Sequence, residues 1–312
     1  MKRTFAIPRG AQIALVAAVL FGISTPLTKP FLKETSSFFT AGLLYFSSGI
    51  SIYIFRKLTG AQSIKMNHSE RTYFGLAVAC GGIVAPVFLL TGLSLISASD
   101  ASILLNLESV LTALIAWFIF KENFDKKILV GMLSIFFGAC IISWNGNFEF
   151  NQAIGTILIL LASTFWALDN NFTRNVISID PTWIASTKGL IAGSTNLAVA
   201  LLLGDQIPPL KTLAAVSVIG VFSFGLSLIL FIVAMRQVGT SRAGAYFAIA
   251  PFFGAIVAFI LGDPVTLQFG IAAIFMGFGI YLHISEDHHH EHYHFEALHC
   301  HSHFPDISHR HH

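Results

Sequence analysis

The chain repeats its own pattern about 142 residues along, and this repeat limits the available folds more than any other feature. The segment Ser97–Phe120 reads SASDASILLNLESVLTALIAWFIF, and Gly239–Gly262 reads GTSRAGAYFAIAPFFGAIVAFILG. Small residues recur in step: Ser99, Ala101, Ala113 and Ala116 match Ser241, Ala243, Ala255 and Ala258. The match extends to both sides, where Leu27-Thr28-Lys29 matches Phe172-Thr173-Arg174, and Gly131 and Gly138 match Gly270 and Gly277. A duplication of this size indicates a fold built from two similar halves.

Composition places these halves in a membrane. Of the 312 residues, 54% are hydrophobic and only 11% are charged, against about 25% charged in soluble domains. So little polar surface cannot coat a globule in water, while 30 Phe and 25 Gly suit packed membrane helices. The sequence has no phosphate-cradling loop or other catalytic pattern, so we expect neither an enzyme nor ATP-driven transport. A net charge of +2 gives no indication of a nucleic-acid partner.

The apolar stretches predict an all-α membrane protein with ten transmembrane helices. A bilayer core of about 30 Å requires about 20 apolar residues per helix. Ten such stretches run near 11–29, 36–55, 72–95, 99–120, 128–145, 152–173, 182–203, 212–235, 240–262 and 266–285. Five fall in each copy, so the first repeat covers residues 10–145 and the second covers 152–285. Because five is odd, the second copy enters the membrane upside down, which gives two inverted five-helix repeats.

Basic residues set the orientation of these spans. If the N-terminus is cytoplasmic, 14 Lys and Arg fall in inside segments, and three fall in outside loops (Lys29, Lys33 and Lys211). We therefore expect a multi-pass protein of the cell (inner) membrane with both termini in the cytoplasm. The inversion agrees with this, because the loop Lys121–Lys127 is basic while its counterpart Asp263–Phe269 has no basic residue.

Two of the spans carry a motif with a family resemblance. The fourth span holds Leu107-Glu108-Ser109-Val110 and closes at Lys121-Glu122, and its twin holds Ala250-Pro251-Phe252 and closes at Gly262-Asp263. The chain thus resembles the drug/metabolite transporter (DMT) superfamily, in particular its ten-span proteins of two EamA-type repeats, which carry Glu-Pro in mid-helix and close in Gly-Glu. It departs from that pattern at Ser109, Ala250 and Asp263. The resemblance covers about residues 10–285; it implies a secondary transporter and leaves the cargo open.

Ionisable residues inside spans are costly and mark candidate functional positions. Glu108 lies near the middle of the fourth span, with Asn106 two residues earlier on another helix face. A carboxylate at that depth suits proton uptake or binding of a cationic cargo. The alternative is a structural Glu, held by a hydrogen bond or kept protonated by burial. Both interpretations stay open.

A second polar group lies in the cytoplasmic parts of the sixth and seventh spans. Asp169, Asn170 and Asn171 are at a depth similar to that of Lys188, so we expect Asp169 and Lys188 to pair. The pair is either a structural link between two helices or part of a gate, in which Lys188 would bind a carboxylate of the cargo.

Aromatic, proline and glycine residues complete the candidates within the spans. The candidate cavity-wall aromatics are Trp166, Tyr246, Phe247 and Trp117, although such residues more often pack or face lipid. Pro86 and Pro251 each remove a backbone hydrogen bond in mid-span and are expected to kink their helices. Each glycine pair of the repeat is separated by seven residues and so shares one helix face, which predicts close helix packing.

The tail, residues 286–312, differs in kind from the spans. Eleven of the 13 His lie between His288 and His312, interleaved with Glu, Tyr, Phe and Pro. Imidazole and thiolate suit Zn²⁺, Ni²⁺, Co²⁺ and Cu ions, so this composition indicates metal binding. The candidate ligands are His288, His289, His290, His292, His294, His299, Cys300, His301 and His303. We expect this cytoplasmic tail to be disordered without metal.

Three functions are compatible with these features. The first is an exporter of a small metabolite or amino-acid-like compound, which works by alternating access between the inverted halves. The second is a transition-metal ion exporter that the His-rich tail feeds or regulates, and the third is a membrane-anchored metal sensor. The expected partners are a small-molecule substrate and the lipid bilayer, with divalent metal ions at the tail. No cofactor is required, and assembly as a homo-oligomer is left open. The first function accounts best for inverted halves and buried charge.

Overall fold

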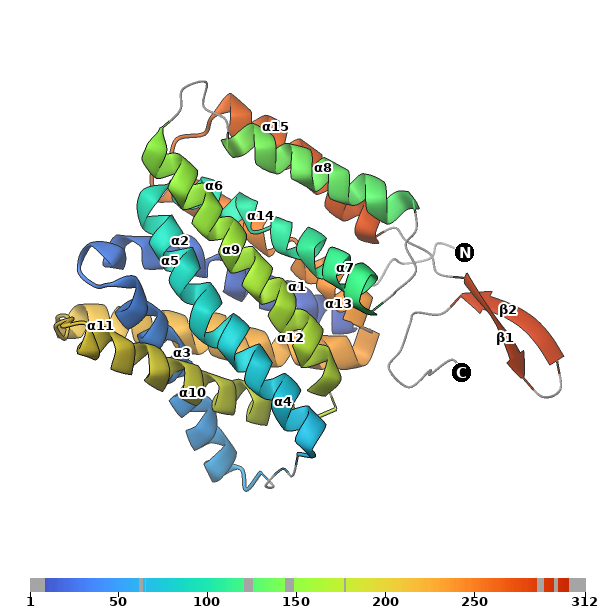
Figure 1. Cartoon of the computed structure of the whole chain (residues 1–312), viewed down its shortest axis with the longest axis horizontal. Coiled ribbons are helices and arrows are strands. Elements are labelled where there is room, and N and C mark those ends of the chain that lie inside the picture. Colours follow the sequence, from blue (N-terminus) through green and yellow to red (C-terminus); the bar gives the residue numbers. More distant parts are fainter. Residues whose placement is uncertain are drawn as a thin grey trace.

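The computed structural model describes residues 9–61, 64, 66–120, 126–143, 149–176, 178–238, 240–284, 289–294 and 297–302. Within them, helical segments lie at each of the ten predicted ranges (Figure 1). The first half comprises α1 (Arg9–Gly22), α2 (Ser24–Thr28), η1 (Lys29–Lys33), α3 (Ser37–Leu58), α4 (His68–Ala77), η2 (Val78–Val84), α5 (Ala85–Leu95), α6 (Ala98–Leu104), α7 (Leu107–Phe120) and α8 (Lys126–Ser143). The second half comprises α9 (Phe150–Thr173), η3 (Arg174–Val176), α10 (Pro181–Leu202), α11 (Leu210–Ile219), η4 (Gly220–Leu226), α12 (Ser227–Val238), α13 (Thr240–Phe247), α14 (Ala250–Ile260) and α15 (Leu267–Ile284).

Length and composition support a membrane location for these helices. Among the described residues, six continuous helical runs are long and apolar enough to cross a membrane: Arg9–Lys33, Ser37–Leu58, His68–Leu95, Ala98–Ile119, Phe150–Val176 and Leu210–Val238. Shorter apolar helices lie at Leu129–Ser143, Ala250–Ile260 and Leu267–Leu282. Large apolar side chains such as Phe118, Leu202 and Ile274 are exposed, as a lipid-facing surface requires. The predicted fold class, an all-helical membrane protein built from two repeats, is confirmed; the count of ten spans stays a prediction.

The two halves pack through equivalent helices. Helix α3 packs along α10, and α8 along α15, so each of these helices meets its own repeat counterpart. The contact of α5 with α9 is matched by that of α12 with α1, and the contact of α7 with α9 is matched by that of α14 with α1. Figure 1 shows α8 and α15 side by side along one edge of the bundle. This pattern is the one expected of halves related by a two-fold axis in the membrane plane.

A π-helix interrupts the third span of each half at the same place. The helices η2 and η4 begin at Val78 and Gly220, which are 142 positions apart. At the end of η2 the amide of Ala85 donates to the carbonyl of Cys80, five residues back, where an α-helix would use the fourth. Pro86, two residues beyond the end of η2, has no N–H to donate to the carbonyl of Gly81, five residues back, so this carbonyl is free to accept other donors. The kink predicted at Pro86 thus falls beside a π-helix and itself stays a prediction.

The fourth span of each half is broken in its middle, between α6 and α7 and between α13 and α14. In the second half Pro251 lies in the first turn of α14, where its missing N–H is tolerated. In the first half the Ser109 hydroxyl donates to the Asn106 carbonyl at 2.7 Å, and the Asn106 amide donates to the Ile103 carbonyl at 3.0 Å. Such side-chain bonds to the backbone favour helix ends. Two different local chemistries therefore encode the same break.

The glycine packing prediction is confirmed at Gly138 of α8 and wrong for Gly270 in α15. A Cβ at Gly138 would lie 2.9 Å from the Ala272 carbonyl oxygen, so this glycine does let the two helices approach. Gly270 faces open space, and Gly279 makes the close contact, since a Cβ added there would lie only 2.5 Å from the Gly131 oxygen. Nine residues span about two and a half helical turns, so Gly270 and Gly279 lie on opposite faces. The crossing of α8 and α15 decides which face is used.

The described parts of the tail form an antiparallel hairpin, β1 (His289–His294) and β2 (Ala297–Ser302), where we expected disorder. Histidine alternates with other residues along this tract, and a period of two suits a strand. His288, His303 and the basic loop residues 121–125 lie outside the described residues.

Candidate functional site

Glu108 is the second residue of α7, just after the helix break, and contacts α9. The Asn170 side-chain amide donates to the Glu108 carboxylate at 2.8 Å and lies 3.4 Å from the hydroxyl of Thr112, one turn further along α7. Glu108 is half-buried and Asn170 is exposed, although both belong to apolar membrane helices. This carboxylate therefore has neutral partners at membrane depth, a costly arrangement that marks a candidate functional group.

The predicted ion pair of Asp169 and Lys188 is present. Lys188 of α10 donates to Asp169 of α9, and their side chains are only 7% and 10% exposed, in the order Lys188 and Asp169. The Thr173 hydroxyl donates to the second carboxylate oxygen at 3.0 Å. A Cβ at Gly81 would lie 1.8 Å from the Asp169 carboxylate, so a glycine in η2 leaves room for the pair. The pair therefore joins α9, α10 and η2, and its two charges cancel.

The free carbonyl of Gly81 is the acceptor for two aromatic side chains. The Tyr45 hydroxyl donates to it at 2.7 Å and the Trp166 indole N–H at 3.0 Å. The Trp166 ring meets Phe21 edge-on, with ring centroids 5.8 Å apart. Sequence reasoning missed Tyr45 and Phe21. The repeat held a signal for Phe21, because the upstream match aligns it with Trp166; no sequence signal pointed to Tyr45.

The remaining candidates lie apart from this group. Asn106 is buried and its amide lies 3.7 Å from the sulfur of Met276 in α15, so it contacts a different element from Glu108. Tyr246 in α13 is half-buried against the apolar core. Trp117 is 39% exposed among other exposed apolar residues near the end of α7, which suits contact with lipid.

The contact equivalent to that of Glu108 with Asn170 is built without polar side chains. Ala250 is the repeat counterpart of Glu108 and Gly254 that of Thr112. A Cβ at Gly22 would lie 2.0 Å from the Ala250 carbonyl oxygen, and a Cβ at Gly254 would lie 2.6 Å from the Gly22 oxygen. The backbones of α1 and α14 therefore touch, while α7 and α9 meet through a carboxylate and its polar partners. This polar contact exists in one half of the described structure only.

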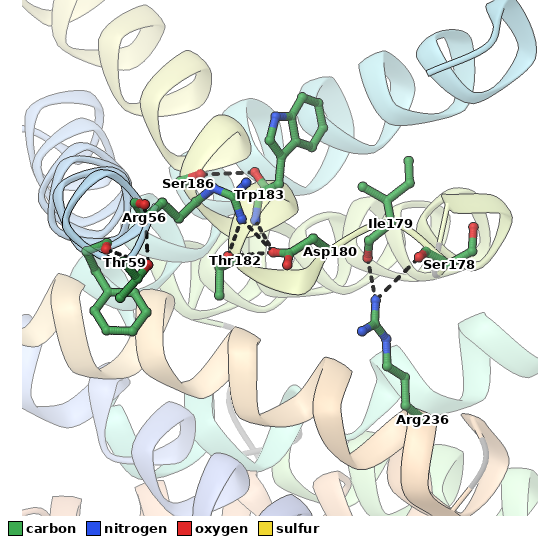
Figure 2. A network of polar contacts seen from close by, with 10 residues as sticks. Arg56, Thr59, Ser178, Ile179, Asp180, Thr182, Trp183, Ser186 and Arg236 are labelled. Atoms are coloured by element: carbon green, nitrogen blue, oxygen red, sulfur yellow. Dashed lines mark hydrogen bonds and ion pairs between the residues drawn. The ribbon is translucent and has the colours of Figure 1, made fainter. Parts of the chain in front are cut away.

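A charged network joins the ends of α3 and α10 (Figure 2). Arg56, in the last turn of α3, donates to Asp180 at 2.7 Å and also to Thr182. Asp180 caps α10 by accepting from the Trp183 amide at 3.0 Å. Burial raises the pKa of Asp180, but the hydrogen bonds from Thr182 and Trp183 and the charge of Arg56 outweigh it and lower the pKa below its usual value. The carboxylate stays ionised at physiological pH.

Two further contacts hold the loop before α10 and the opposite end of the α3–α10 pair. Arg236 of α12 donates to the Ile179 carbonyl at 2.6 Å, beside Asp180 (Figure 2). At the other end of α3 and α10, Ser36, the N-cap of α3, donates to Asp205 just beyond α10. Ser36 and Asp180 cap the same span of their respective halves. The α3–α10 pair is thus fastened at both ends by related contacts.

Two hollows lie away from these polar residues. An apolar groove of about 630 Å³ includes Leu27, Phe31 and Leu261, and a pocket of about 350 Å³ includes Arg71 and Trp183. Neither includes Glu108, so the site is recognised by its polar contacts. Among the side chains that the structure describes, no three of His, Cys, Asp and Glu gather as metal ligands.

A membrane protein of two inverted five-helix halves, with ionisable residues between them, has the architecture of a secondary transporter. The family model of the EamA-like transporter family matches this chain twice, at residues 8–144 and 153–285. The chain belongs to the EamA-like transporter family, which is of the DMT type that its motifs predicted.

Similar proteins agree with this assignment. The chain is 30% identical over 287 residues to a transporter from Methanothermobacter thermautotrophicus, covering 86% of this chain and 84% of the relative. It is 23% identical to the Bacillus subtilis transporter YvbV, covering 83% of this chain and 86% of that one. A crystal structure with 16% identity covers 89% of this chain and 96% of its own at a TM-score of 0.68, which shows the same fold. The protein is a multi-pass membrane transporter, and its family implies a small-molecule substrate.

Proposed function

We propose that the protein exports a small metabolite or amino-acid-like compound across the cell (inner) membrane by alternating access between its halves. The observation that carries the proposal is the one-sided polar contact of Glu108 with Asn170, whose repeat counterpart is closed by glycine. The excess of Lys and Arg in one set of loops supports cytoplasmic termini.

Glu108 is the proposed coupling and binding group. Asp169 already has Lys188 as its counter-ion, whereas Glu108 is bonded to the neutral amide of Asn170. A carboxylate with a neutral partner can take up a proton when the site faces one side of the membrane. It can bind a cationic group, such as the ammonium of an amino acid, when that proton leaves. Proton and cargo then compete for one oxygen pair, which couples their opposite movements.

Asp169 and Lys188 have a structural role in this proposal. Both side chains are almost fully buried and bonded to each other, and Gly81 packs directly against the carboxylate. The pair holds α9 and α10 to the π-helix η2, and Lys188 is not offered to a carboxylate of the cargo.

A growth screen identifies the cargo. Cells that lack or overproduce the protein are challenged with amino acids, toxic analogues and metal salts. We expect overproduction to raise tolerance to an organic compound. A change of tolerance confined to metal salts would oppose this proposal and favour the metal-exporter alternative.

The coupling role is then tested with that compound in reconstituted vesicles at stepped pH. Glu108→Gln removes the titrating group, so we expect transport to become independent of pH and to fall about 100-fold, the lower end of the range for a lost proton-transfer group. The matched control is Glu70→Gln at the start of α4, where Gln preserves the capping box with Asn67. An unchanged pH dependence in Glu108→Gln would remove Glu108 from the coupling step.

A further inference from the structure

We propose that the tail hairpin binds one divalent transition-metal ion through the imidazoles of His290, His292, His299 and His301. The strands β1 and β2 pair in a register that sets His290 opposite His301 and His292 opposite His299. Directly opposite residues occupy the same face of an antiparallel pair, and residues two apart along a strand share that face. The four histidines therefore occupy neighbouring positions on one face, and His294 follows them at the end of β1 on the same face.

The other face has a different composition. The pairs on it are His289 with Ser302, Glu291 with Cys300, and Tyr293 with Leu298. Cys300 is thus assigned to the face opposite the four histidines, although it lies between two of them in the sequence. The register therefore predicts an all-nitrogen ligand set, where composition alone suggested a mixed set with a thiolate.

The spacing suits a single ion. Opposite Cβ atoms in an antiparallel pair are about 4.5–5.5 Å apart, and residues two apart along a strand are separated by about 7 Å. Four histidine positions at this spacing supply as many nitrogen ligands as the four-coordinate shell of Zn²⁺ takes. Neutral imidazoles also bind Cu²⁺, Ni²⁺ and Co²⁺.

The sequence supports a histidine face independently of the register. Histidine occupies every second position from 288 to 294 and again from 299 to 303. An isolated two-stranded hairpin is marginally stable in water. An ion that binds only the paired form adds its binding free energy to the pairing, so metal and hairpin stabilise each other. Because protonated imidazole cannot ligate, binding weakens as the pH falls through about 6.5.

The test uses the full-length protein in detergent, purified without an oligohistidine tag. It is titrated with Co²⁺, whose visible spectrum reports the ligand atoms, and then competed with Zn²⁺. The variant His290→Gln/His299→Gln removes two of the four proposed ligands. Its control, His289→Gln/Cys300→Ser, removes two potential ligands from the opposite face.

We expect one tight ion per chain and no sulfur-to-cobalt charge-transfer band. The same-face variant should bind about 100-fold more weakly or worse, which is about 2.7 kcal/mol, and the opposite-face control should bind as the wild type does. Equal losses in the two variants would mean an unspecific histidine tract and overturn the proposal. A thiolate band that disappears in the control would overturn the face assignment. The binding proposal is independent of transport, so Glu108→Gln protein should bind the ion normally.

Discussion

Replacing Lys188 by Met would leave Asp169 as an uncompensated charge in the interior of the helical bundle. The Asp169 side chain is only 10% exposed, and the Thr173 hydroxyl would be its remaining described donor. Removing one partner of a buried ion pair costs about 3–5 kcal/mol, because the other charge stays buried. Met has an apolar stem similar to that of Lys and adapts to its surroundings, so little of this cost arises from lost packing.

The double variant Lys188→Met/Asp169→Asn separates charge from packing. It leaves no buried charge, and Asn can still accept the Thr173 hydroxyl. Replacing both members of a buried ion pair by uncharged residues often changes stability little. We therefore expect the double variant to be only about 1 kcal/mol less stable than the wild type. The double variant should then be about 2–4 kcal/mol more stable than Lys188→Met alone.

The assay is thermal unfolding of the detergent-solubilised protein. At about 2–4 °C per kcal/mol, the single variant should unfold about 6–20 °C below the wild type and the double variant within about 4 °C of it. Lys57→Met, at an exposed position of α3, is the control and should stay within about 0.5 kcal/mol. If the double variant unfolds as early as the single one, the cost does not come from an unpaired charge, and the reasoning is refuted.

Three further predictions concern backbone contacts and the charged network. Gly81→Ala would place a methyl carbon 1.8 Å from the Asp169 carboxylate, so the free energy of unfolding should fall by about 1–3 kcal/mol. Gly75 faces open space, so Gly75→Ala should raise the free energy of unfolding by about 0.4–1 kcal/mol. Gly22→Val should abolish the monodisperse peak in size-exclusion chromatography, since α1 has no room beside α14, and a normal profile would contradict this. Because the pKa of Asp180 is depressed, its stabilisation is present above its unfolded pKa of about 3.9 and is lost as pH falls through the lower folded value. The loss of stability caused by Asp180→Asn should therefore be constant from pH 5 to 8, at about 1 kcal/mol or less because this position is half-exposed. A loss that vanishes at pH 5 would contradict the lowered pKa of Asp180.

The sequence predicts those parts of the fold that hydropathy and symmetry determine. The duplication and its odd number of spans define two inverted halves, and depth alone brings Asp169 and Lys188 together, as the ion pair confirms. Burial of charge costs so much that only a partner at the same depth can offset it. For that reason a single sequence reveals this contact.

Features that depend on small local differences were not predictable. Nothing in hydropathy distinguishes a π-helix from an α-helix, so the acceptor role of Gly81 and its donor Tyr45 emerged only with the structure. The choice between opposite glycine faces of α15 depends on the crossing of two helices, which no local pattern encodes. The histidine alternation in the tail is visible in the sequence, but the register that separates Cys300 from its neighbours is a pairing between strands.

The matched π-helices also record the history of the protein. A π-helix accommodates one more residue in its turn than the α-helix it interrupts, and η2 and η4 lie at equivalent positions of the two copies. The simplest account is that the extra residue was present before the gene segment was duplicated. The ancestor was then a five-helix chain whose descendants now sit in opposite orientations, so its fold tolerated both. The lysines and arginines that fix orientation differ between the copies and therefore diverged after the duplication, as did the position that is Glu108 in the first copy and Ala250 in the second.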